Sequence, residues 1–319
     1  MIKLKVPLFL GVLLFFYLEM TNAEKFGMMV TRQIDFNRKS DSMKVKRSER
    51  LVEMTIEFIQ HPHKIFPLDY FTDRFNAAKS SISEDLNIVK GTFARRHLGE
   101  IITYSGARGG VQFIPVISKS QVADYVRQLQ DALHQSERLL PGGYIYTSDI
   151  LSQPEWLKKI GKLIASRYSR NDIDAILTIA TKGIPIAQSV AEELGVPFVI
   201  VRKASKVTEG STVGINYVPY SSADVMERME LSTRSLHPQT SVLIIDDFLR
   251  GGGTVNGLTM VANEFQCHVV DTVVFIENMR LDEPIKVLYH SLFRIESVNS
   301  ETKKIQVKSG NFFAEDLSF

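Results

Sequence analysis

One stretch of the sequence decides the fold: Ser241-Val-Leu-Ile-Ile-Asp246-Asp247-Phe-Leu-Arg250-Gly-Gly-Gly-Thr254-Val-Asn-Gly257. Its apolar run at residues 242–245 is typical of a strand buried on both faces of a parallel sheet. The apolar residues at 258, 261, 262 and 265 have helical spacing. We therefore predict a strand–loop–helix unit that places Asp246 and Asp247 at the carboxyl end of a core strand, where open α/β sheets bind ligands.

The loop of this unit has the composition of a phosphate site. Three glycines let backbone N–H groups turn towards one point, and the helix that follows adds free N–H groups and a positive dipole end. The two carboxylates suit hydroxyls or a hydrated Mg²⁺. Phosphate on one side and hydroxyls on the other describe a ribose 5-phosphate. Neither G-x-x-x-x-G-K-[ST] nor G-x-G-x-x-G is present, and the stretch resembles the phosphoribosyl-pyrophosphate (PRPP) motif of type I phosphoribosyltransferases.

Length and composition set outer limits on the interpretation. A chain of 319 residues is long enough for two domains with their own cores. The formal net charge of +2 indicates no partner, so a nucleic-acid surface would have to be a local patch. Cys267 is the single cysteine and is predicted to be a core thiol, which fits a reducing compartment.

Residues 1–43 do not match the rest of the chain. Lys3 and Lys5 precede an apolar run at 6–17, and then comes Thr21-Asn22-Ala23, an order that is typical of a secretory signal peptide. An intracellular metabolite as ligand argues against secretion. Met43 begins a second plausible start, so we favour a start assigned too far upstream over a membrane-tethered regulator. We expect a cytoplasmic protein with no stable membrane association.

Residues 44–117 are predicted to form a winged helix-turn-helix. Helical spacing at 50–59, 67–75 and 78–96 is followed by strand signals at 99–104 and 111–115 around a glycine-rich turn. In this fold the third helix enters the major groove of DNA. The candidate DNA-binding residues are polar or basic: Arg47, Arg50, Lys79, Ser80, Ser81, Ser83, Arg95, Arg96 and, at the tip of the wing, Arg108. The alternative is a small docking or dimerisation domain, and Glu84 and Asp85 on the third helix count against DNA binding.

Residues 118–319 are predicted to form a parallel sheet of repeated βα units. Strands are expected at 175–180, 196–201 and 269–276 besides the central one. Their carboxyl ends carry basic or glycine residues suited to a pyrophosphate: Thr181, Lys182, Gly183, Arg202 and Lys203. Tyr144 is either a stacking platform or a packed tyrosine. The last strands, at 293–298 and 304–307, are expected to form a small hood over the site.

With both halves in view, the chain from about Val45 to Phe313 resembles the PurR-type purine operon repressors of Gram-positive bacteria. The resemblance rests on long motifs: Arg-Ser-x-Arg-Leu-Val, His61-Pro-His63, Ala78-Lys-Ser-Ser-Ile-Ser-Glu-Asp-Leu86, Leu140-Pro-Gly-Gly-Tyr-Ile-Tyr146, Ala180-Thr-Lys-Gly-Ile-Pro185, Lys206-Val-Thr-Glu-Gly-Ser-Thr-Val213 and the Asp-Asp-Phe loop. It covers nearly the whole chain after Ser42.

The resemblance implies a homodimeric winged-helix repressor of purine synthesis and transport genes that binds double-stranded operator DNA. Its phosphoribosyltransferase-like domain would be a PRPP sensor without an obligatory cofactor. The implied roles are as follows: Asp246 and Asp247 hold the ribose hydroxyls, directly or with Mg²⁺; Arg250, Gly251, Gly252, Gly253 and Thr254 surround the 5-phosphate; Thr181, Lys182 and Gly183 take the pyrophosphate; Tyr144 and Phe248 line the purine side; and residues 79–83 face DNA.

Arg250 and Gly251 stand where the enzymes commonly have small residues and Thr, which puts catalysis in doubt. The alternative function is an active purine phosphoribosyltransferase, which would release pyrophosphate from PRPP and a purine base. A guanine nucleotide bearing a pyrophosphate fits the same charge layout, so we hold it as a candidate corepressor.

Overall fold

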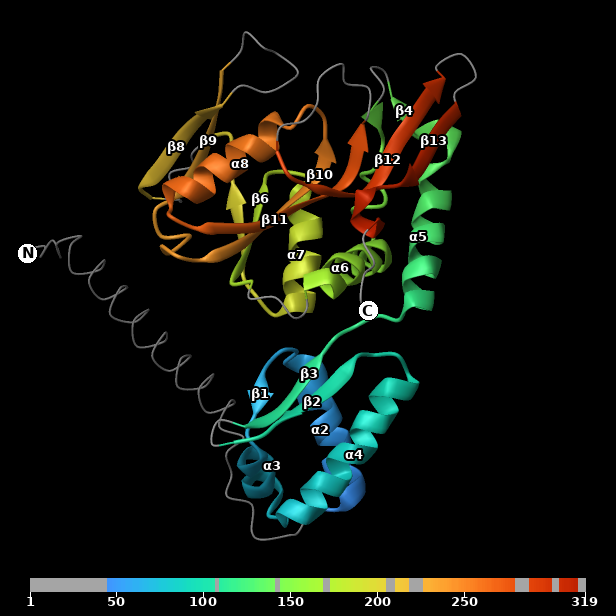
Figure 1. The fold of residues 1–319 in the computed structure, drawn as a ribbon, viewed down its shortest axis with the longest axis vertical. Helices are drawn as coiled ribbons and strands as arrows, with labels where there is room; N and C mark the ends of the chain where they lie inside the picture. The colour runs from blue at the N-terminus through green and yellow to red at the C-terminus, as the bar shows by residue number, and fades with distance from the viewer. Residues whose placement is uncertain are drawn as a thin grey trace, which may run out of the picture. The chain divides into compact units, whose positions relative to one another are not determined.

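A computed structural model describes residues 45–106, 109–140, 144–168, 173–204, 210–217, 226–278, 287–299 and 304–314 (Figure 1). The expectations for the N-terminal segment before residue 45 and for Arg108 lie outside these residues. Within the described ranges, no helix has the length and apolar character needed to cross a lipid bilayer.

The N-terminal region is a winged helix-turn-helix, as predicted. Its elements in chain order are α2 (Arg47–Gln60), β1 (Ile65–Phe66), α3 (Leu68–Phe75), α4 (Lys79–Arg95), β2 (Glu100–Tyr104) and β3 (Gly110–Ile114). β2 and β3 form the antiparallel wing, and β1 pairs with the other edge of β3. The sequence analysis did not identify β1, because two residues are too few to show an alternating pattern.

Phenylalanine side chains hold this region together. The Phe58 ring centroid lies 5.8 Å from that of Phe66 and 5.7 Å from that of Phe71. Phe93 of α4 makes an edge-on contact with Phe113 of β3 at 4.9 Å. Because all five rings are buried, α4 is fixed by its inner face and its outer face is left for other contacts.

The larger region is built on one six-stranded sheet (Figure 1). Its strands are β6 (Ala175–Ile179), β7 (Phe198–Val201), β10 (Ser241–Leu249), β11 (His268–Asn278), β12 (His290–Asn299) and β13 (Lys304–Ser309), in the order β13-β12-β11-β10-β6-β7. All neighbours are parallel except β12 and β13. The expectation that the last two strands form a separate hood is therefore wrong, since β12 continues the main sheet beside β11 and β13 follows it.

Both faces of this sheet are covered. One core contains Ile176, Leu243 and Phe275 together with residues from α5 (Lys119–Leu133), α6 (Pro154–Tyr168) and α7 (Gly183–Leu194). The other contains Leu177 and Ile244 with residues from α8 (Gly253–Glu264) and from the ribbon of β8 (Thr212–Tyr217) and β9 (Glu227–Ser232). The alternation of neighbouring residues between two cores explains why the central strands are uninterrupted apolar runs. Cys267 is a buried free thiol in the second core, as predicted.

The strand order identifies where the sheet opens. From β6 the chain moves to β7 on one side, and it later returns to place β10 on the other side of β6. The connections that follow β6 and β10 therefore leave the sheet in different directions. In α/β sheets this switch point, at the carboxyl ends of the strands, is the usual ligand site.

Candidate ligand site and candidate nucleic-acid interface

Asp246 and Asp247 lie at the switch point. β10 pairs with β6 only as far as Ile245, opposite Thr178, but continues beside β11 to Leu249. The two carboxylates are therefore at the sixth and seventh of the nine residues of the strand, rather than after its end as the sequence suggested. They lie beyond the last pair with β6, where the gap between β6 and β10 begins.

The environment of the two aspartates disfavours their charged forms. Burial and then the charge of Asp247 hold the pKa of Asp246 well above its ordinary value, and Asp246 is only 4% exposed. Burial also raises the pKa of Asp247, while the positive charge of Lys182 acts in the opposite direction. The Asp247 backbone N–H donates to Asp246 Oδ1 at 2.9 Å. Such a pair is suited to hydroxyl donors or a cation, either of which would stabilise the ionised carboxylates.

The loop after β6 packs directly against this pair. The Ala180–Thr181 peptide is cis, and α7 begins at Gly183. A Cβ atom at Gly183 would lie 2.4 Å from Thr178 Oγ1 and 3.3 Å from Asp246 Oδ1. Glycine is needed here because the chain itself approaches closely. The result places the Thr181–Lys182–Gly183 loop beside the acidic pair.

The glycine-rich loop presents partial positive charge, opposite to the negative charge of the two carboxylates. Gly251 and Gly252 both have φ of 76°, in the left-handed region that favours glycine. Gly252 is the N-cap of α8 and has no side-chain cap, and Gly253 and Thr254 form the first turn. The uncapped amides at the start of α8 can therefore bind an anion, and a 5-phosphate as that anion stays a prediction.

Three predicted site residues form an aromatic–cationic cluster. The Tyr144 ring centroid is 5.8 Å from that of Phe248, and the Arg250 guanidinium lies 5.0 Å from the Tyr144 centroid. Tyr144 is 40% exposed, so it is available for stacking rather than packed in the core. A planar group could stack against the exposed side of this cluster.

Lys203 is held by a partner that the sequence analysis did not find. Its Nζ lies 2.6 Å from Glu227 Oε2, and the Tyr217 hydroxyl donates to the same oxygen at 2.5 Å. The hydrogen bonds from Lys203 and then Tyr217 lower the pKa of Glu227. Arg202 is joined through its backbone to Glu230 of β9. No sequence signal links Glu227 to Lys203, because the contact depends on how the ribbon returns to β7.

The structure changes the interpretation of Arg50 and Asp85 in the N-terminal region. Arg50 is 6% exposed and donates from Nε to Asp85 Oδ2 at 2.8 Å, and Arg47 Nε donates to Asp85 Oδ1 at 2.8 Å. The expectation that Arg50 contacts DNA is not compatible with this burial. Asp85, which counted against DNA binding, is fully buried and paired, so it does not face outwards from α4.

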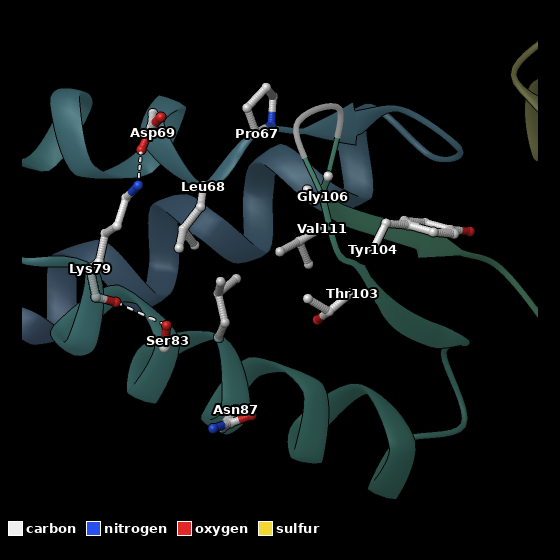
Figure 2. A pocket seen from close by; sticks show the side chains of 13 residues that line it. Pro67, Leu68, Asp69, Lys79, Ser83, Asn87, Thr103, Tyr104, Gly106 and Val111 are labelled. Carbon is white, nitrogen blue, oxygen red and sulfur yellow. Dashed lines mark hydrogen bonds and ion pairs between the residues drawn. The ribbon is translucent and has the colours of Figure 1, made fainter.

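The start of α4 borders a cleft of about 430 Å³ between α3, α4 and the wing (Figure 2). Lys79 Nζ lies 2.8 Å from Asp69 Oδ1, and the Ser83 hydroxyl donates to the Lys79 carbonyl at 2.9 Å. Ser80 and Ser83 are exposed and Ser81 is half-buried. At the other end, Arg95 donates to Thr92 Oγ1 at 3.2 Å and Arg96 is exposed.

Comparison with known proteins agrees with both halves. Residues 46–115 match the family described as "Bacterial purine repressor, N-terminal", and residues 147–309 match the "Phosphoribosyl transferase domain". The chain is 46% identical to the purine biosynthesis transcriptional repressor PurR of Bacillus subtilis (strain 168) over 85% of this chain and 94% of that protein. The chain belongs to the PurR family of bacterial purine repressors.

Two other relatives mark the range of the similarity. A PurR of Lactococcus lactis, 44% identical over 84% of this chain and 99% of its own length, carries the name of a transcriptional activator. A xanthine phosphoribosyltransferase of Brevibacillus brevis is 29% identical over 55% of this chain and 94% of that enzyme. The two PurR relatives cover 85% and 84% of this chain, whereas the enzyme covers 55%.

Proposed function

We propose that this protein represses purine biosynthesis and transport genes by binding operator DNA, and that PRPP relieves this repression. One observation carries the proposal: a purine-repressor N-terminal domain and a phosphoribosyltransferase domain occur in one chain. A salvage enzyme has no need of a winged helix. We further propose that the protein acts in the cytoplasm as a homodimer, with one domain at residues 44–117 and the other at 118–319.

The geometry of the switch point supports PRPP as the effector. Asp246 and Asp247 would accept hydrogen bonds from the ribose hydroxyls, and the uncapped start of α8 would hold the 5-phosphate. Lys182 and Lys203 lie close enough to the acidic pair to act on its pKa values, so they would hold the pyrophosphate together with Thr181 and Arg202. Mg²⁺ fits the two carboxylates and would take its remaining ligands from PRPP oxygens.

The purine side of the site supports sensing rather than turnover. Arg250 stacks on Tyr144 where a base would approach Phe248. A cation in this place strengthens binding of an anionic ligand without a catalytic role. A guanine nucleotide that carries a pyrophosphate would use the same stacking and phosphate groups and would compete with PRPP as a corepressor.

Relief of repression requires that PRPP bind one state of the protein better than the other. Either PRPP favours a dimer in which the recognition helices miss adjacent grooves, or it competes with DNA for a basic surface. Contacts to phosphates also predict that DNA binding weakens steeply with salt.

The test is binding of the protein to purine-gene promoter DNA at fixed salt, with and without PRPP and Mg²⁺. Specific binding that PRPP weakens is expected, and a protein with Asp246→Ala and Asp247→Ala should bind DNA without responding. Equal, weak binding to promoter and random DNA would eliminate the proposal. In vitro transcription from the same promoter distinguishes repression from activation. An activator would raise the transcript level, and the Lactococcus relative is named as an activator.

An active purine phosphoribosyltransferase is the second candidate, favoured by the 29% identity to xanthine phosphoribosyltransferase across the sheet region. It predicts release of pyrophosphate when PRPP is mixed with xanthine, guanine, hypoxanthine or adenine. Release at a rate typical of enzymes, about 1 per second or faster, would favour it.

A further inference from the structure

We propose that Asn87, in the middle of α4, is the residue that reads an adenine in the operator. This inference rests on the proposed DNA-binding function and adds a specificity-determining side chain to it. The residues at the start of α4 were expected to face DNA because of their polarity; Asn87 is identified by its position and by its unused hydrogen-bonding groups.

Asn87 lies on the outer face of α4. It is two positions from Val89, which is 3% exposed in the core, and two positions correspond to about 200° around a helix. Its own side chain is exposed. Figure 2 shows Lys79, Ser83 and Asn87 on successive turns of α4, beside the cleft that separates the helix from the wing. In the winged helix-turn-helix this outer face is the one that enters the major groove.

Three polar groups on the same side of α4 already have partners within the protein. Lys79 pairs with Asp69, and the Ser83 hydroxyl donates to the Lys79 carbonyl. Glu84 lies 3.5 Å from Arg47. By contrast, no group among the described residues forms a hydrogen bond with the Asn87 side-chain amide. Its donor and its acceptor both remain available to a partner.

An amide with both groups free matches one base edge in the major groove. Adenine presents the N7 acceptor and the N6 donor side by side, which is the complement of the Asn amide. Guanine presents two acceptors, cytosine a donor and thymine an acceptor with a methyl group. A bidentate contact from Asn87 therefore selects adenine, whereas the serine hydroxyls of α4 bond to any of the four bases.

Gly91, one turn further along the same face, provides a second observation. Glycine inside a helix is less favourable than alanine by about 1 kcal/mol. A Cβ added at Gly91 would meet only the end of the flexible Arg95 side chain, at 3.4 Å. The protein's own packing thus gives no reason for a glycine here, and a close approach of the DNA backbone to α4 does give one.

The experiment uses the full chain as wild type, Asn87→Ala, Asn87→Gln and Asn263→Ala. Asn263 is an exposed residue near the end of α8 and controls for the loss of a helical asparagine. Preferred sites are selected from random-sequence DNA with each protein. We expect Asn87→Ala to lose the preference for adenine at one position. Its affinity for the wild-type site should fall by about fivefold to a hundredfold, and its affinity for random DNA should stay within about twofold. Asn87→Gln should retain part of the preference, and Asn263→Ala all of it.

A modified base isolates the contact itself. With 7-deazaadenine at that position, the affinity of the wild-type protein should fall by a factor similar to the one that Asn87→Ala causes. The affinity of the Asn87→Ala protein should not fall further. Unchanged base preferences in Asn87→Ala would overturn the inference, as would an equal loss of affinity on random DNA. If the wild-type protein selects no sequence, the proposed DNA-binding function fails. If the wild-type protein selects a site and the Asn87 variant selects the same site, only the inference about Asn87 fails.

Discussion

The two regions of the molecule each contain a buried aspartate, Asp85 in the winged helix and Asp246 in the sheet region, and the surroundings of these two carboxylates are opposite. In the winged helix, Asp85 is fully buried and receives hydrogen bonds from Arg50 and Arg47, each at 2.8 Å. In the sheet region, Asp246 is 4% exposed. Within the described ranges, neither Asp246 nor Asp247 forms an ion pair. Asp85 is therefore neutralised by the protein's own residues, as is Glu277 of the sheet region, whose partner is Arg294, whereas Asp246 is not.

This difference separates a structural charge from a functional one. A buried carboxylate that has lost its partners is strongly destabilising, and a paired one is held in place. The Asp85 contacts fix α4 before any partner arrives, whereas the acidic pair remains unfavourable until a ligand supplies hydroxyls or a cation. Removing the carboxylate should consequently lower stability at Asp85 and raise it at Asp246.

The largest effect is expected from Asp85→Ala. It leaves Arg50 buried without its carboxylate, which should cost about 3–5 kcal/mol of the free energy of unfolding of the winged helix and abolish specific DNA binding. Urea denaturation with hydrogen exchange on α2 and α4 measures the loss. Glu84→Ala, one residue earlier, is the control; its carboxylate is 70% exposed and its removal should change stability by no more than about 0.5 kcal/mol. Equal stability of the two variants would show that the Asp85 pairs do not hold the helix.

The opposite sign is expected for Asp246→Asn. The substitution removes an unfavourable buried charge and should stabilise the protein at neutral pH by about 0.5–2 kcal/mol, the usual range for single stabilising changes. It should also remove the thermal shift that PRPP with Mg²⁺ produces in wild type. A variant less stable than wild type at neutral pH would contradict the comparison.

The pH dependence of this effect follows from the raised pKa of Asp246. The folded state keeps its proton above the pH at which the unfolded state, with a pKa near 3.9, loses it. Wild-type stability therefore falls as pH rises from about 4 through the folded-state pKa. The advantage of Asp246→Asn should be present at neutral pH and disappear below about pH 4, as thermal unfolding at a series of pH values will show.

An effect smaller than that of Asp85→Ala is expected from Gly183→Ala, which tests the packing that brings the basic loop to the acidic pair. The new Cβ would lie 2.4 Å from Thr178 Oγ1, and such overpacking costs about 1–3 kcal/mol. Affinity for PRPP should fall as well, because the loop moves away from Asp246. Adding Thr178→Ala should restore much of the stability and much of the PRPP affinity, because it removes the clashing hydroxyl. Thermal unfolding and PRPP titration of the single and double variants measure the recovery, and a double variant no better than Gly183→Ala would locate the strain elsewhere.

The sequence predicted well what depends on local pattern. The apolar run at 242–245 identified the central strand, and the glycines at 251–253 identified the left-handed turn before α8. Helical spacing identified α2, α3 and α4. These features depend on neighbours along the chain, and the residue types alone specify them.

What the sequence did not predict depends on contacts between distant segments. Arg50 belongs to an apparent basic patch until α4 places Asp85 against it, and Glu227 has no relation to Lys203 until the ribbon forms. The strand at 304–309 reads as part of a hood, yet it pairs with β12 because the sheet still has an open edge there. For the two side-chain pairs the partner lies more than about twenty residues away, beyond the reach of periodicity or spacing. β12 and β13 are neighbours along the chain, and the contact that the sequence does not show there is the one between β12 and β11.

The smallest effect is expected at the exposed pair of Lys79 and Asp69, whose side chains are 65% and 66% exposed. Unlike Asp85, Asp69 contributes little to stability at this exposure, but it places a negative charge at the entrance to α4 and occupies Lys79. Asp69→Asn should therefore leave thermal unfolding unchanged and increase DNA affinity, most clearly at low salt. Lys79→Met should lower the slope of log affinity against log salt by about one unit if Lys79 contacts a phosphate. Fluorescence anisotropy over a range of salt concentrations measures both variants. If Asp69→Asn changed stability and left DNA affinity unchanged, the Lys79–Asp69 pair would be structural, as the Asp85 pairs are. The distinction between charges that hold the fold and charges that bind a partner would then not extend to the surface of the winged helix.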